Sequence, residues 1–237
     1  MPALPVMVAL PGTLCSPAVF GPLGEALAGQ VTVDPFSWLT GPGPWDIPAV
    51  AGRVARHIEH EYGGPVLVCG HSTGGAIALQ LAVSQPEAVL GLVLADTGAH
   101  MRGHGDVDAI LGRIKAGWSE ELRAAVLDRS FHVPLSPPAR AGFLAWAAPL
   151  SQQAVYDVLA SQRDLDLTPG LAGITQPAIV LHGRYDRARD PDQGRELAAA
   201  LPDAEFRLLD TGHTPVYEAP AAVADAVRAV LSRSRPR

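Results

Sequence analysis

The feature that most constrains this chain is a serine between glycines, at the junction of two segments of opposite character. Residues 70–74 read GHSTG. Val66–Cys69 is short, apolar and partly β-branched, which favours a buried strand, and residues 75–82 are rich in alanine and leucine, which favours a helix. A strand that turns into a helix within about four residues crowds its backbone, and glycines at 70 and 74 relieve that crowding. The sequence therefore predicts a sharp corner that exposes the side chain of Ser72.

The rest of the chain alternates short apolar runs with longer helical patterns. This alternation predicts an α/β fold, with a doubly wound, mostly parallel sheet of about six strands joined by helical crossovers. The predicted strands are Val6–Leu10, Val31–Asp34, Val66–Cys69, Leu90–Ala95, Ala178–Leu181 and Glu205–Leu209. The predicted core helices are Ala18–Leu27, Ile47–Tyr62, Thr73–Ser84, Pro191–Leu201 and Ala219–Leu231.

One long interval contains no strand-like run. About 80 residues between Thr97 and Gln176 carry helical patterns separated by prolines, which is too long for an ordinary crossover. We therefore predict a core domain of residues 1–96 and 177–237, and an inserted helical cap, or lid, of residues 97–176. The predicted cap helices are Val107–Ala116, Ser119–Phe131, Ala139–Ala147 and Gln152–Gln162, and a polar hinge loop contains His100, His104, Asp106 and Asp108.

Composition narrows the class of protein. The chain has 237 residues, of which 48% are hydrophobic and 18% charged, so it is globular rather than disordered. A net charge of -6 gives no electrostatic reason to bind nucleic acid or an anionic membrane. No apolar run reaches the ~20 residues that span a bilayer, and residues 1–10 lack the features of a signal peptide. We expect a cytoplasmic protein that acts on a small molecule, with Cys15 and Cys69 as free thiols.

Reactive residue types follow three of the predicted strands, where ligands gather in an open α/β sheet. Ser72 follows the third strand, Asp186 the fifth and His213 the sixth. A serine hydroxyl loses its proton as it attacks, and a histidine can accept that proton while a carboxylate orients the imidazole. We predict Ser72 as the nucleophile, His213 as the general acid and base, and Asp186 as the orienting acid. Asp96, which follows the fourth strand, is the alternative acid.

Acyl transfer at Ser72 also requires amide donors for the negatively charged oxygen of the intermediate. We expect these donors to be the backbone N–H groups of Thr73, at the start of the next helix, and of Thr13, in the loop after the first strand. Because only backbone atoms are needed, the threonine side chains are not predicted to be essential. The residues predicted to line the substrate pocket are Leu14, Met101, Phe131 and Trp146.

The remaining histidines are interpreted as structural. His71 and His182 flank predicted reactive residues, and we expect them to position loops. His57, His60 and Glu61 fall on neighbouring helical positions, a spacing that metal ligands also use, but no third segment converges on them. We interpret them as a solvated helix face, and we predict neither a metal nor a cofactor.

Four segments resemble those of a capped serine esterase or lactonase with the α/β-hydrolase fold. LPGTLCSPAVF resembles the oxyanion loop, VCGHSTGG the nucleophile elbow, IVLHGRYDRARDP the acid loop and DTGHTPVYEAP the histidine loop. They occur in family order over almost the whole chain. The resemblance implies an α/β-hydrolase fold that lacks the family's first two strands. One departure is Pro11, which stands where the family often has the histidine of an HG pair.

The resemblance also implies a reaction. We expect a serine hydrolase that needs no cofactor and cleaves a carboxylic ester or lactone of a small to medium, largely apolar substrate through an acyl-enzyme. Hydrolysis of C–C bonds, thioester cleavage and cofactor-free perhydrolysis use the same three residues and stay open, as does a ligand-binding sensor with negligible turnover. Thr214 follows His213 where cyanohydrin-cleaving relatives carry a lysine, which argues against that lyase activity.

Overall fold

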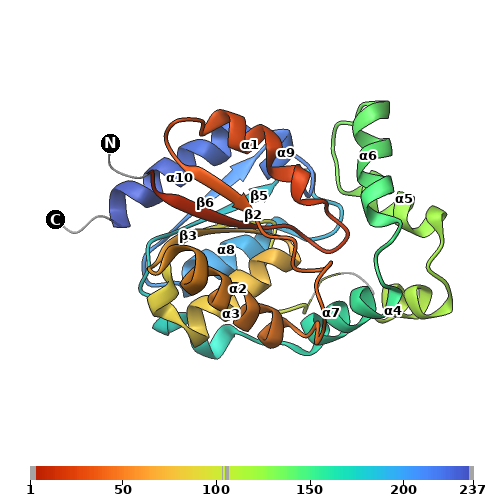
Figure 1. The fold of residues 1–237 in the computed structure, drawn as a ribbon, viewed down its shortest axis with the longest axis horizontal. Helices are drawn as coiled ribbons and strands as arrows, with labels where there is room; N and C mark the ends of the chain where they lie inside the picture. The colour runs from red at the N-terminus through yellow and green to blue at the C-terminus, as the bar shows by residue number, and fades with distance from the viewer. Residues whose placement is uncertain (1–3, 103, 105–106, 235–237) are drawn as a thin grey trace.

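A computed structural model describes residues 4–102, 104 and 107–234. Its centre is a sheet of six parallel strands in the order β2-β1-β3-β4-β5-β6 (Figure 1). The α/β class, the parallel sheet and the number of strands are thus as the sequence predicts. The strands are β1 (Val6–Leu10), β2 (Thr32–Pro35), β3 (Val66–His71), β4 (Val89–Ala95), β5 (Ala178–Gly183) and β6 (Ala204–Leu209).

Helices cover both faces of the sheet, with α1, α9 and α10 on one side and α2, α3 and α8 on the other (Figure 1). Strand side chains alternate between the two faces, so one strand supplies both cores. In β1, Val8 and Leu10 join the core with α2 and α3, whereas Met7 and Ala9 join the core with α1 and α10. The core helices are α1 (Gly21–Ala26), α2 (Ile47–Tyr62), α3 (Thr73–Ser84), α8 (Pro191–Ala200), α9 (Pro215–Glu218) and α10 (Pro220–Ser234).

One predicted core helix is divided in the structure, and another directly follows a short separate helix. The pattern over 18–27 becomes a 3-10 turn, η1 (Pro17–Phe20), followed by α1, because Pro22 lacks the N–H that a continuous helix requires. The pattern over 219–231 is preceded by the short helix α9, and α10 starts at Pro220, a favourable first residue for a helix.

The segment between β4 and β5 lies beyond the carboxyl ends of the strands, at one end of the molecule (Figure 1). Within it, α4 packs on α7 and α5 packs on α6. Ser119 caps α5 by accepting a hydrogen bond from the Leu122 N–H, at 3.2 Å. Asp106, expected in the hinge loop, lies outside the described residues. The elements of this segment are α4 (Val107–Ala116), α5 (Glu120–Arg129), α6 (Pro137–Ala147), α7 (Gln152–Asp164) and the 3-10 turn η3 (Thr168–Gly173).

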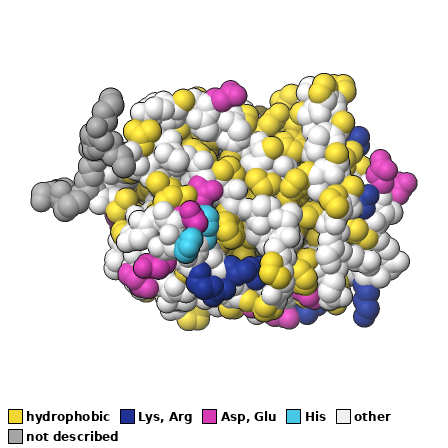
Figure 2. Space-filling model, viewed as in Figure 1, with side chains coloured by type: hydrophobic (Ala, Val, Ile, Leu, Met, Phe, Trp, Pro, Cys, Tyr) yellow, Lys and Arg dark blue, Asp and Glu magenta, His cyan; other side chains and the backbone are white. Residues whose placement is uncertain are grey.

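The surface drawn in Figure 2 mixes hydrophobic and uncharged groups, and charged side chains form small separate groups on it. Among the residues that the structure describes, no helix combines the length and hydropathy required to cross a bilayer.

The sheet order reverses between β1 and β3, because the chain leaves β1 for the edge strand β2 and then returns to the other side. The carboxyl ends of β1 and β3 therefore border a crevice of the kind in which α/β sheets bind ligands. Glycine brings the two strand ends close together. A Cβ added at Gly74 would lie 2.0 Å from the Leu10 carbonyl oxygen, and one at Gly70 would lie 2.5 Å from the Gly74 oxygen.

Replacing Gly74 by alanine is expected to lower the free energy of unfolding by about 2 kcal/mol or more, because the clash is with backbone that cannot rotate away. The matched control is Gly142→Ala, in the exposed middle of α6, where an added Cβ meets nothing within 4 Å. That change should raise stability by about 0.5–1 kcal/mol. Urea unfolding of both variants tests the pair, and equal stabilities would contradict the close-packing argument.

Candidate active site

Ser72 occupies the corner between β3 and α3. Its φ of 53° lies in the left-handed region that non-glycine residues rarely adopt. Two hydrogen bonds hold this conformation: the Ser72 N–H donates to the Ala95 oxygen at 2.8 Å, and the Thr97 hydroxyl donates to the Ser72 oxygen at 2.8 Å. Leu14 and Asp96 also have positive φ, of 66° and 48°. All three follow strands at the same edge of the sheet, which is where strained backbone often accompanies function.

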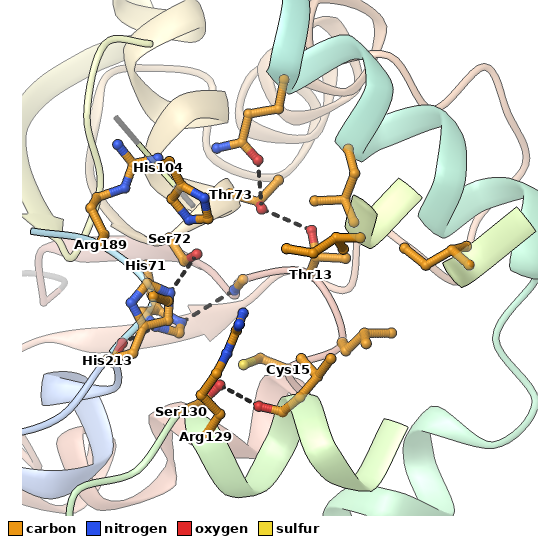
Figure 3. A pocket seen from close by; sticks show the side chains of 18 of the residues that line it. Thr13, Cys15, His71, Ser72, Thr73, His104, Arg129, Ser130, Arg189 and His213 are labelled. Atoms are coloured by element: carbon orange, nitrogen blue, oxygen red, sulfur yellow. Dashed lines mark hydrogen bonds between the residues drawn. The ribbon is translucent and has the colours of Figure 1, made fainter. Parts of the chain in front are cut away.

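The structure brings together Ser72, His213 and Asp186, from the ends of three strands (Figure 3 shows the first two). His213 Nε2 lies 2.9 Å from Ser72 Oγ, and His213 Nδ1 lies 2.7 Å from Asp186 Oδ2. The other oxygen of Asp186 accepts the backbone N–H groups of Ala188 and Arg189, at 2.7 and 3.0 Å. These bonds leave Oδ2 free to face the imidazole.

Asp96, the alternative acid, lies beside Asp186 and not against His213. Its Oδ1 accepts the Gly183 N–H at 2.9 Å, and its Oδ2 is buried with no hydrogen-bond partner among the described residues. His182 Nε2 sits between the two acids, 3.6 Å from Asp96 Oδ1 and 3.3 Å from Asp186 Oδ2.

The pKa values of the two carboxyl groups shift in opposite directions. Burial, followed by the neighbouring charge of Asp186, raises the pKa of Asp96 well above its usual range. Burial also acts to raise the pKa of Asp186, but the charge of His213 and hydrogen bonds from His182 and His213 outweigh it, so the pKa lies well below its usual range. Asp186 therefore ionises far more readily than Asp96.

Asp96, His182 and Asp186 also form a group whose ligand atoms lie within 4.8 Å of one another. A metal ion there would compete with His213 for Asp186 Oδ2, since that oxygen already bonds His213 Nδ1. The geometry thus suits a hydrogen-bonded network better than a cation site. The histidines of α2 give no such cluster: His57 Nε2 lies 2.6 Å from Asp34 Oδ2, half-buried between α2 and β2. His60 and Glu61 are exposed, as expected of a solvated helix face, whereas His57 is half-buried.

The amides expected to stabilise an oxyanion lie at the edge of the pocket. The Thr73 N–H is the first of α3, and the first amides of a helix have no partner within it. The Thr13 N–H donates no hydrogen bond to any described residue. The threonine side chains are also engaged: Thr13 Oγ1 donates to Thr73 Oγ1 at 2.8 Å, and Thr73 Oγ1 donates to Gln162 Oε1 of α7 at 2.9 Å (Figure 3).

His71 links the two loops that flank Ser72. The Gly12 N–H donates to His71 Nδ1 at 3.3 Å, and His71 Nε2–H donates to the His213 carbonyl oxygen at 2.6 Å. Burial and the neighbouring His213 lower the pKa of His71 to about 3. The imidazole is therefore neutral, with one nitrogen accepting and the other donating.

A pocket opens above Ser72 and His213, with about 780 Å³ of space that is partly open to solvent. Leu14 and Met101 line it, whereas Phe131 and Trp146, expected there, do not. Phe131 stacks on Phe143 and meets Tyr217 edge-on, and Trp146 packs against the core. These two side chains of the inserted segment thus pack away from the pocket, Phe131 partly against α9, whereas Trp118 of the same segment lines it. The apolar walls come from α4, α5 and α7 and the loop between α4 and α5: Ile110, Ile114, Trp118, Leu122, Val126 and Leu159.

Several residues of the site were not singled out from the sequence. Gln162 and Glu218 bond across loops, and Arg129 and Arg189 line the pocket. His104, expected only in the hinge loop, lines the pocket as well. Glu218 lies in the DTGHTPVYEAP segment, so its position near His213 was a usable signal. Its carboxylate accepts the N–H groups of Gly212, His132 and Val133, at 3.0, 2.8 and 3.3 Å.

Comparison with known proteins places this geometry in a family. The family model described as alpha/beta hydrolase matches residues 7–226. Lipase LipV of Mycobacterium tuberculosis is 33% identical over 218 residues, which cover 82% of this chain and 78% of the lipase.

Two solved structures share the fold. A hydrolase from Pseudomonas aeruginosa superposes with a TM-score of 0.86 at 22% identity, covering 98% of this chain and 91% of that one. The enol-lactonase from Burkholderia xenovorans gives 0.85 at 23% identity, covering 97% and 92%. At these identities the likeness concerns the fold. Together with the family match over most of its length, these findings show that the chain belongs to the alpha/beta hydrolase family.

Proposed function

We propose that this protein is a serine hydrolase that cleaves a carboxylic ester or lactone through an acyl-enzyme, without a metal or cofactor. The observation that supports the proposal most directly is the continuous hydrogen-bonded series from Ser72 through His213 to Asp186. Similarity to a lipase also supports an ester as the bond that is cleaved. Residues 97–176 act as the lid of the site. We also propose a cytoplasmic location, which unpaired Cys15 and Cys69 fit.

In the proposed reaction, Ser72 Oγ attacks the carbonyl carbon while His213 Nε2 accepts the hydroxyl proton. Asp186, held ionised, stabilises the imidazolium that results. The Thr13 and Thr73 amides donate to the oxygen of the tetrahedral intermediate. His213 then returns the proton to the leaving alcohol, and the same groups activate a water that releases the acid and restores Ser72.

Replacing Ser72 by alanine is expected to abolish turnover of a p-nitrophenyl acyl ester, because the attacking oxygen is lost while the fold is kept. Release of p-nitrophenol measures the activity, and thermal unfolding checks the fold. The control is Ser84→Ala, at the far end of the same helix, where the hydroxyl donates only to the Gln80 oxygen. Hydrolysis by the Ser72 variant at the wild-type rate would sink the proposal.

The acid assignment is tested by comparing Asp186→Asn with Asp96→Asn. The first change removes the charge bonded to His213 and is expected to lower kcat by about 10³–10⁴-fold. The second changes a carboxyl that makes no hydrogen bond to His213, so kcat should fall far less. The reverse order of effects would assign the orienting role to Asp96.

His71 is expected to make the free energy of unfolding depend on pH. Its pKa of about 3 in the folded state lies below the ~6.5 of an unfolded histidine, so the unfolded chain binds more protons between these values. Stability from this group is complete above about pH 6.5 and is lost as the pH falls towards 3, at up to ~1.4 kcal/mol per pH unit. Urea unfolding across this range should show a shallower pH dependence for His71→Gln than for wild type. His60→Gln, at an exposed site on α2, should keep the wild-type dependence, and identical curves for all three proteins would refute the assignment.

A further inference from the structure

The charges that line the pocket are unbalanced. Arg129 and Arg189 are among its lining residues, and within the part of the chain that the structure describes no aspartate or glutamate lines it. Burial lowers the pKa of the lining residue His104 to about 4, so its imidazole is neutral at pH 7. The negative charge of Asp186, beneath His213, acts on Arg189 and offsets its positive charge. Arg129 is therefore the lining arginine whose charge has no acidic partner among the described residues.

The two arginines are not equivalent. Arg189 is buried, and acceptors of the protein occupy its guanidinium: the His100 oxygen at 3.1 Å, Met101 Sδ at 3.0 Å, and Gln193 Oε1. Three of the five N–H groups of its guanidinium thus already donate to the protein.

Arg129 ends helix α5 and extends its side chain into the pocket (Figure 3). It makes no hydrogen bond or ion pair with any described residue, whereas its neighbours are engaged: Arg140 pairs with Asp128 at 2.7 Å, and Arg123 donates to the Trp118 oxygen at 2.8 Å. Asp128, next to Arg129 in sequence, is thus already taken by another arginine.

From these observations we infer that the substrate of this hydrolase carries a carboxylate, and that Arg129 binds it. The inference rests on the proposed function and adds a substrate class to it. A guanidinium presents a planar fork of donors that matches a carboxylate in a two-bond contact. One free guanidinium suits a single negative charge, and the apolar walls suit a hydrocarbon body between that charge and the scissile carbonyl. The substrate class is therefore an ester or lactone with an apolar body and a terminal carboxylate, rather than a wholly apolar one.

The test uses monomethyl esters of straight-chain dicarboxylic acids of four to eight carbons, each paired with the methyl ester of the monocarboxylic acid of equal length. Wild type is expected to favour the charged member by about tenfold or more in kcat/KM at one chain length. In Arg129→Gln this ratio should fall about tenfold, and Arg129→Lys should retain part of it. Added salt should reduce the preference, because the contact is accessible to water.

The matched control is Arg113→Gln. Arg113 lies on α4 of the same inserted segment, is exposed and does not line the pocket, so the change in net charge is equal. Its ratio should equal that of wild type. The inference is overturned if wild type shows no preference for the charged esters, or if Arg129→Gln keeps the preference. Hydrolysis of the neutral esters would in that case still support the proposed function.

If no ester of the series is hydrolysed, that result counts against the proposed function. A binding measurement then still tests the carboxylate site. Titration calorimetry with monomethyl adipate should give about tenfold tighter binding to Ser72→Ala than to the double variant that also carries Arg129→Gln. Equal affinities would overturn the carboxylate site. Thermal unfolding of each variant shows whether a loss reflects the fold.

Discussion

The site depends on the contact between the start of α3 and the end of β1, where glycine allows backbone to touch backbone. No side chain fits between Gly74 and the Leu10 carbonyl. This approach sets the loop after β1 beside the nucleophile corner, so that the Thr13 and Thr73 amides border the same space. Their hydroxyl groups are within hydrogen-bond distance of each other for the same reason. The position of Ser72 and that of the amides that would serve it thus follow from one packing constraint.

Polar contacts around this constraint connect loops that are distant in sequence. His71 joins the loop after β1 to the loop after β6, and Gln162 joins the start of α3 to helix α7. Each is buried, so an unmade bond would cost about 1–3 kcal/mol. The two acids near His213 also differ in their donors. Asp186 accepts hydrogen bonds from two amides and from His213, whereas Asp96 accepts one, and the pKa of Asp186 is lowered while that of Asp96 is raised.

Local sequence patterns were enough to predict the sheet, since apolar runs of β-branched residues mark strands whatever surrounds them. The same patterns predict that Ser72, Asp186 and His213 lie at one edge of the sheet, because the residues that follow parallel strands all leave the sheet at that edge. The pocket was harder. Phe131 packs against Tyr217, which is far along the chain, and nothing in the local pattern announces that partner. In sequence, Arg129 is an ordinary arginine at the end of a helix. Only the structure shows that the adjacent Asp128 pairs with Arg140 and that Arg129 lines the pocket. The local pattern of α2 does not indicate that His57 is half-buried, because its partner Asp34 lies in β2.

Glu218 couples two loops through one side chain. One of its oxygens accepts the Gly212 N–H beside His213, and the other accepts the N–H groups of His132 and Val133, in the stretch that joins α5 to α6. A single carboxylate therefore satisfies backbone donors from both loops, so its removal would leave three amides without their acceptor at once. The turn that carries the imidazole and the stretch after α5 thus share one anchor, and the position of His213 depends on a contact outside the three reactive residues.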